Sequence, residues 1–176
     1  ANTVERSPME KLLQALTSAK NGDFSVRLLE EQDDEFRAIA GTFNELMAMN
    51  ESMSDEIVRV SRVVGREGRM TERASLENAT GAWQTTVSAV NSLVSDLMQP
   101  TTQLAQVIGA VAEGDLTQKM ALAIDGSPIQ GEFLRIGTTV NTMVDQLRAF
   151  ASEVTRVAKE VGTEGKLGGQ AEVPGV

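Results

Sequence analysis

The sequence contains no cysteine and no histidine. Without cysteine, the chain can build neither a disulfide framework nor a thiolate metal site. Without histidine, it lacks the usual general base, the commonest metal ligand and a histidine phosphoacceptor. We therefore expect that this chain is not an enzyme and that it carries no catalytic residue, no cofactor and no metal.

Aromatic residues and positive charge are also scarce. Aromatics make up 3% of the 176 residues and hydrophobic residues an ordinary 41%, a balance that suits helical bundles better than β-sandwiches. The net charge of −9 argues against nucleic acid and anionic membrane surfaces, because both bind basic patches. No apolar run approaches the roughly 20 residues of a membrane-spanning helix, and no secretory signal pattern opens the chain. We expect a cytoplasmic segment with no nucleic-acid partner and no membrane insertion.

The most regular feature present is an apolar seam with residues alternately three and four positions apart. One copy is Phe133, Ile136, Val140, Met143, Leu147, Phe150, Val154, Val157 and Val161. Earlier copies are Phe36, Ile39, Phe43, Leu46, Asn50, Met53, Ile57, Val60 and Val64, and Trp83, Thr86, Val90, Leu93, Leu97, Pro100, Leu104, Val107 and Val111. A mean spacing of about 3.5 residues is typical of coiled coils. The seams predict an all-α fold.

The seams belong to a repeat that is marked by glycines. Gly22, Gly68, Gly114 and Gly165 each follow a helical pattern, at spacings of 46, 46 and 51 residues. Glycine in that place predicts a helix C-terminal cap. The second helix of each repeat is marked by an aromatic residue that lies seven positions before an apolar residue followed by asparagine. These pairs are Phe43-Asn44, Val90-Asn91 and Val140-Asn141. We expect repeats at 6–54, 55–101 and 98–150, and the start of a truncated fourth at 151–176.

Each repeat reads as a helix, a polar connector that carries some apolar residues, and a second helix. No stop signal lies between the second helix of one repeat and the first helix of the next, so the two should be continuous. A long connector lets the two helices lie parallel, and two chains in register would then form a parallel four-helix bundle. Asn50 on the seam either specifies register in the dimer or marks a junction where the seam opens to water.

Three other sequence patterns are interpreted as structural features and not as binding sites. Trp83 is a core filler by its seam position. The carboxylates Glu30, Glu31, Asp33, Asp34 and Glu35 lack the ligand spacing and central glycine of a calcium loop, so they indicate a helix start and solvated surface. Gly114-Asp115 is a turn and not a phosphate loop, because no Lys-Ser/Thr follows it.

The spacing resembles the HAMP domain of sensor kinases and chemoreceptors. The matching residues are Pro8, Gly22, Asp23, Phe24, Glu35 and Phe36 in the first repeat, and Pro100, Gly114, Asp115, Leu116, Glu132 and Phe133 in the third. The second repeat departs from the pattern, with Glu67-Gly68-Arg69-Met70 at the turn and Ala82 in place of glutamate. The partial fourth has Glu164-Gly165-Lys166-Leu167. Such alternation resembles the poly-HAMP arrays of hybrid histidine kinases.

The resemblance implies a non-catalytic relay segment, most consistent with a histidine kinase of a two-component system, whose partners are a second copy of itself and the flanking domains of its parent chain. It implies a dimer core and relay path through the seam residues Phe36, Phe43, Leu46, Ile57, Val64, Trp83, Val90, Leu97, Leu104, Val111, Phe133, Ile136, Val140, Met143, Leu147, Phe150 and Val154. Turn and helix-start roles fall to Gly22, Gly68, Gly114, Gly165, Glu35 and Glu132. The alternatives are a passive dimeric coiled-coil spacer, or the relay segment of a chemoreceptor or cyclase.

The second repeat also shifts its apolar phase. Extrapolating Leu12, Leu16 and Ala19 by 46 residues gives Val58, Arg62 and Gly65, whereas the seam residues there are Ile57, Val60 and Val64. If neighbouring bundles prefer different core phases, a helix that they share cannot satisfy both. We therefore predict coupled two-state bundles.

Overall fold

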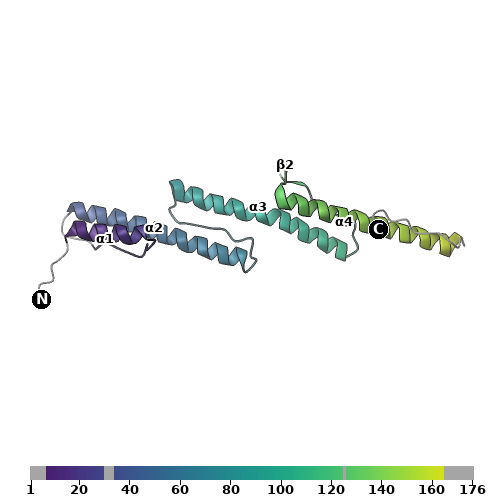
Figure 1. The fold of residues 1–176 in the computed structure, drawn as a ribbon, viewed down its shortest axis with the longest axis horizontal. Coiled ribbons are helices and arrows are strands. Elements are labelled where there is room, and N and C mark those ends of the chain that lie inside the picture. Colours follow the sequence, from purple (N-terminus) through teal and green to yellow (C-terminus); the bar gives the residue numbers. More distant parts are fainter. Residues whose placement is uncertain (1–6, 30–33, 125, 165–176) are drawn as a thin grey trace. The chain divides into compact units, whose positions relative to one another are not determined.

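The computed structural model describes residues 7–29, 34–124 and 126–164, with side chains up to residue 162 (Figure 1). Its helices are α1 (Pro8–Lys20), α2 (Asp34–Gly65), α3 (Gly81–Ala112) and α4 (Gly131–Glu164). A short antiparallel ribbon, β1 (Ala123–Ile124) with β2 (Ser127–Pro128), is the one sheet among the described residues. The all-α class predicted from the seams is confirmed. Gly165, and Glu30, Glu31 and Asp33 of the carboxylate cluster, lie outside the described residues.

The chain divides into two compact parts, residues 1–94 and residues 95–176, and each is described here by itself. In the first part, α1 runs beside the first half of α2 and in the same direction (Figure 1). The second half of α2 lies with the first half of α3 around a small apolar cluster. In the second part, the remainder of α3 lies with α4.

Local sequence explains where the helices begin. Ser7 caps α1: its hydroxyl accepts a hydrogen bond from the Glu10 amide at 3.3 Å, while the Glu10 carboxylate accepts one from the Ser7 amide at 3.0 Å. Pro8 follows at the first helical position, where its missing N–H costs nothing. The acidic residues Asp34 and Glu35 of α2, and Glu132 of α4, lie in first turns, where they stabilise exposed amides.

Three apolar clusters hold the connectors against the helices. The first gathers Ala15, Leu28, Phe36, Ala40, Phe43 and Met47. The second contains Val60, Ala74 and Val94, and the third Val107, Met120 and Val144. Each cluster takes one buried residue from a connector, namely Leu28, Ala74 or Met120, at intervals of 46 residues. The connectors are therefore packed parts of the fold.

Candidate functional site

The connectors begin with a tight turn at the glycines. Gly22, Gly68 and Gly114 have φ angles of +89°, +71° and +86°, a conformation that is costly for any residue with a Cβ. The amides that follow turn back to the helix ends: Asp23 N–H donates to Ser18 at 3.0 Å and Asp115 N–H to Ala110 at 2.8 Å.

A carboxylate closes this turn in the first and third repeats. Asp23 accepts hydrogen bonds from the Ser25 amide and hydroxyl, and Asp115 accepts them from the same groups of Thr117. The Thr117 hydroxyl is the main reason that the pKa of Asp115 lies below its ordinary value, with its amide and Gln118 helping. Arg69 occupies this position in the second repeat, so that turn has no equivalent acceptor.

An asparagine of each second helix then binds the backbone of its connector. In the first repeat, Leu28 N–H donates to Asn44 Oδ1 at 2.8 Å and Asn44 Nδ2 donates to the Leu28 carbonyl at 2.9 Å. Asn91 makes the same two bonds to Ala74 (2.7 and 2.9 Å), and Asn141 to Met120 (2.8 and 2.9 Å). We call this arrangement the asparagine–backbone pair. It fixes the register of the connector on the second helix in all three repeats.

An ion pair adds to this attachment in the first and third repeats. Arg27, which precedes Leu28, contacts Glu51 of α2 at 2.6 Å. Lys119, which precedes Met120, contacts Asp145 of α4 at 2.7 Å. Both basic residues therefore reach from the connector to the second helix of their own repeat.

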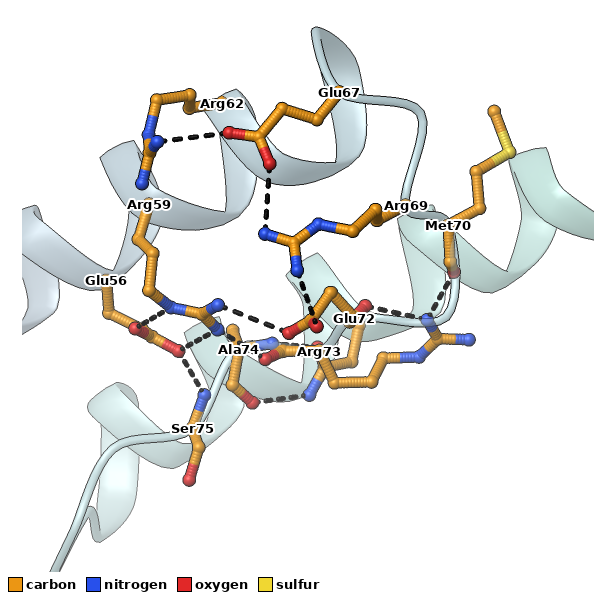
Figure 2. A network of polar contacts seen from close by, with 11 residues as sticks. Glu56, Arg59, Arg62, Glu67, Arg69, Met70, Glu72, Arg73, Ala74 and Ser75 are labelled. Atoms are coloured by element: carbon orange, nitrogen blue, oxygen red, sulfur yellow. Dashed lines mark hydrogen bonds and ion pairs between the residues drawn. The ribbon is translucent and has the colours of Figure 1, made fainter.

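The second connector is instead tied to the first helix of its repeat by a chain of alternating charges (Figure 2). Arg59 of α2 contacts Glu56 at 2.7 Å and Glu72 of the connector at 3.3 Å, and it donates to the Arg73 carbonyl at 2.8 Å. Glu56 also accepts the Ser75 amide at 2.7 Å. The chain continues from Glu72 through Arg69 and Glu67 to Arg62, at 3.8, 2.9 and 3.0 Å. We call these six charged side chains the Arg59 network.

The network shifts the protonation equilibria of its central pair. The hydrogen bond from Arg59 lowers the pKa of Glu56 against the opposing effect of burial, and the Ser75 amide lowers it further. Hydrogen bonds to Glu56 and Glu72 raise the pKa of Arg59. Both groups therefore remain charged at neutral pH.

No group of acidic side chains suited to a metal ion occurs among the described residues. No helix within them is long and apolar enough to cross a membrane. The site is the joint between connectors and helices.

Comparison with known protein families identifies the family that has these helices and connectors. Residues 6–52 match the HAMP domain family model, and residues 78–149 match a second HAMP domain model. Together the two matches cover about two thirds of the 176 residues.

The chain belongs to the HAMP domain family.

HAMP domains are non-catalytic signal-relay modules that typically form dimeric four-helix bundles. The two matches leave residues 53–77 outside, which include the end of α2, the Arg59 network and Ala74. The Arg59 network therefore lies in a stretch that neither match covers.

The residues predicted for the HAMP dimer core fall into three groups in the single chain. Phe36 and Phe43 are buried within it. Half-buried are Val64, Trp83, Val90, Leu104, Val111, Phe133, Ile136 and Val140. Exposed are Leu46, Ile57, Leu97, Met143, Leu147, Phe150 and Val154, at 38–53% of their surface. The seam as counted from sequence therefore mixes a face that packs on the connector with a face that is open.

Several buried residues lie beside the counted seam and were missed. Ala40 (0% exposed), Met47 and Val144 (0%) pack on connectors one position after Ile39, Leu46 and Met143. The signal was present as a second stripe, Phe36, Ala40, Phe43 and Met47, at the spacing of a helix face. The asparagines were recognised as markers of the repeat, but their bonds to the connector were not foreseen.

The first helices of the repeats differ in the face that they bury. The first repeat packs Leu12, Ala15 and Ala19, and the third packs Leu104, Val107 and Val111, the equivalent positions two repeats of 46 residues further on. The corresponding residues of the second repeat, Val58, Ser61 and Gly65, are all exposed, Val58 to 65%. Val60 (3%) and Val63 (2%) are buried there in their place. The first helix of the second repeat thus presents a different face to its connector.

Proposed function

We propose that this chain is the relay segment of a cytoplasmic histidine kinase of a two-component system. In this proposal two copies pair in parallel, and bundles at 6–54, 55–101 and 98–150 with the start of another at 151–176 pass conformational changes from a sensory domain to the kinase. Each bundle has two packing states, and neighbouring bundles bias one another through a shared helix.

The observation that carries this proposal is that the two halves of α2 bury different faces of the helix. α2 is one uninterrupted helix from Asp34 to Gly65, and it supplies the second helix of the first repeat and the first helix of the second. Its two halves pack on different connectors with different faces. A rotation that improves packing at one end therefore moves the other end away from its preferred packing, because a helix is torsionally stiff over a few turns. Opposed preferences of this kind make a two-state element.

The exposed seam residues supply the surface for pairing. Leu46, Leu93 and Met143 occupy one position of the repeat pattern and are 41%, 59% and 38% exposed. Together with Leu97 and Leu147 they leave a line of exposed apolar side chains on each of the helices α2, α3 and α4. Burial of such a line between two copies releases water from apolar surface, which favours the dimer.

A passive spacer is the rival function. A spacer requires a uniform seam and has no need for a repeat that buries a different face of its first helix. A chemoreceptor or cyclase parent would use the same relay, and the output domain of the parent protein would distinguish these parents from a kinase.

Cysteine cross-linking tests the relay directly, since the natural chain has no cysteine to interfere. We expect Leu147→Cys to form a disulfide-linked dimer rapidly and its exposed neighbour Gln146→Cys to do so slowly. One alanine inserted after Ser54 turns everything beyond it on α2 by about 100°, whereas a seven-residue insertion keeps the phase.

The relay predicts that the one-residue insertion changes the cross-linking rate at Leu147→Cys about fivefold or more, a typical coupling between sites. The seven-residue insertion should leave that rate nearly unchanged. If both insertions leave it unchanged, the chain is a passive spacer.

A further inference from the structure

The second connector has less apolar anchoring than the other two. Its buried residue is Ala74, where the first and third repeats have Leu28 and Met120. The cluster around Ala74 contains two further buried residues, Val60 and Val94, as many as the cluster around Met120 and fewer than the cluster around Leu28. Apolar burial scales with the area removed from water, so an alanine contributes least of the three.

The second helix of the second repeat also carries different residues at the two positions that bind the other connectors by charge. Arg73 is the equivalent of Arg27 and Lys119, but the positions on α3 that correspond to Asp145 and Glu51 are Ser95 and Met98, which carry no charge. The Arg73 guanidinium donates to the carbonyls of Met70 and Glu72, at 2.8 Å each, within its own connector.

What the connector has gained is the Arg59 network. The network joins α2 to connector residues 67–75 through the side chains of Glu67, Arg69 and Glu72, the Arg73 carbonyl and the Ser75 amide (Figure 2). Its side chains are neither buried nor fully solvated: the Arg59 and Glu72 side chains are each 37% exposed and that of Glu56 is 15% exposed. Ions in the solvent can therefore reach the network.

We propose that the second repeat is an ionic-strength-sensitive element, in which dissolved salt loosens the connector from α2 while the other two connectors remain docked. Screening weakens interactions between accessible charges, since the Debye length falls from about 10 Å at 0.1 M salt to about 3 Å at 1 M. Apolar contacts such as those of Leu28 and Met120 are not weakened by sodium chloride in this way. The inference does not depend on the relay function, because it concerns the docking of one connector.

Hydrogen–deuterium exchange of the purified protein tests it. The peptides compared are 69–79 from the second connector, and 23–29 and 115–122 from the other two, at 0.05 and 1 M sodium chloride. An unstructured reference peptide corrects for the effect of salt on intrinsic exchange. We expect exchange in 69–79 to rise about fivefold with salt and exchange in the other two peptides to change less than about twofold. A parallel rise in all three, or none in 69–79, would overturn the proposal.

Two variants separate the network from a general effect of salt. Arg59→Met keeps the aliphatic stem and removes the charge, so exchange in 69–79 should already be high at 0.05 M and respond little to further salt. Arg156→Met removes an arginine that is paired with Glu153 and Glu160 within α4, and the salt response of 69–79 should persist. An Arg59→Met protein that keeps the wild-type salt response would overturn the proposal. Neither readout involves cross-linking at Leu147, so failure here and failure of the relay are distinguishable.

Discussion

The side-chain amide of Asn141 satisfies both backbone groups of Met120, accepting its N–H at 2.8 Å and donating to its carbonyl at 2.9 Å. An amide can do this because it offers one acceptor and two donors in a plane, as a neighbouring β-strand would. Met120 is 3% exposed, so its backbone groups have little access to water. The pair therefore supplies partners that a buried connector needs and a helix surface does not ordinarily offer.

Removal of this amide should loosen the third connector. We expect Asn141→Ala to lower the free energy of unfolding by about 1–3 kcal/mol, because two backbone groups of a buried residue lose their partners. Urea unfolding followed by circular dichroism measures the change, and faster exchange of peptide 115–122 localises it. Gln146→Ala, at an exposed position of the same helix, should change stability by less than about 0.5 kcal/mol. Equal effects of the two variants would contradict the role of Asn141.

Close approach of a connector explains a glycine in α4. A Cβ on Gly137 would lie 2.8 Å from Leu122 Cδ2 and 3.1 Å from Met120 Sδ. Gly41, in the interior of α2, has open space in the same direction. Gly41→Ala should stabilise the protein by up to about 1 kcal/mol through helix propensity. Gly137→Ala should be less favourable than Gly41→Ala by at least about 1 kcal/mol, because the added methyl displaces the connector. Thermal unfolding of both variants checks this difference.

Acid should weaken the second and third repeats through two carboxylates. The pKa of Glu56 lies below its ordinary value of 4.5 and that of Asp115 below its ordinary value of 3.8. As pH falls, the unfolded chain takes up these protons first, so the stability that each group contributes is complete above its ordinary pKa and is lost as pH falls through the folded value. We expect the urea midpoint to fall between about pH 5 and pH 3.

Glu56→Gln isolates one of these contributions. The variant should be less stable than the natural chain at pH 7 and should lose less stability on acidification, since glutamine does not titrate. Urea unfolding at four pH values measures how the free energy of unfolding changes with pH in the variant and in the natural chain. Identical slopes for the variant and the natural chain would show that Glu56 does not contribute.

The line of exposed apolar side chains should form the dimer interface. Leu147 is 38% exposed in the single chain, so a charge placed there costs the chain's own core little. Leu147→Glu should raise the dimer dissociation constant at least about tenfold, because a partner copy would have to bury an unpaired carboxylate. Gln146→Glu introduces the same group one position earlier and should have little effect. Light scattering across a concentration series gives the dissociation constants, and equal values would place the interface elsewhere.

Periodicity and glycine spacing were enough to predict the all-α fold and the positions of the long helices. The seam contains the information because apolar residues three and four positions apart can be buried together only on a helix. The same count could not separate Phe43, buried at 6%, from Leu46, exposed at 41%, since both fit a spacing of 3.5. Separating them requires knowing where the connector lies.

The joints were less predictable. Asn44, Asn91 and Asn141 repeat in sequence, but their bonds to the connector depend on a contact 16 to 21 residues away along the chain. The Arg59 network joins residues from two elements, and charge in the sequence alone is equally typical of a solvated surface. The shifted phase of the second repeat was visible in the sequence, in contrast. Its seam runs through Ile57, Val60 and Val64, whereas a repeat of 46 residues from Leu12, Leu16 and Ala19 would place it at Val58, Arg62 and Gly65.

The asparagine–backbone pair has a consequence for how such chains can diverge. Because the amide contacts only the main chain of its partner, the side chain there can be Leu28, Ala74 or Met120 without loss of either hydrogen bond. The side chain of the connector can therefore change at the point of attachment. Such a substitution alters how strongly the connector is held, but it leaves the register between the connector and the second helix unchanged. Duplicated repeats could in this way acquire separate sensitivities within one chain.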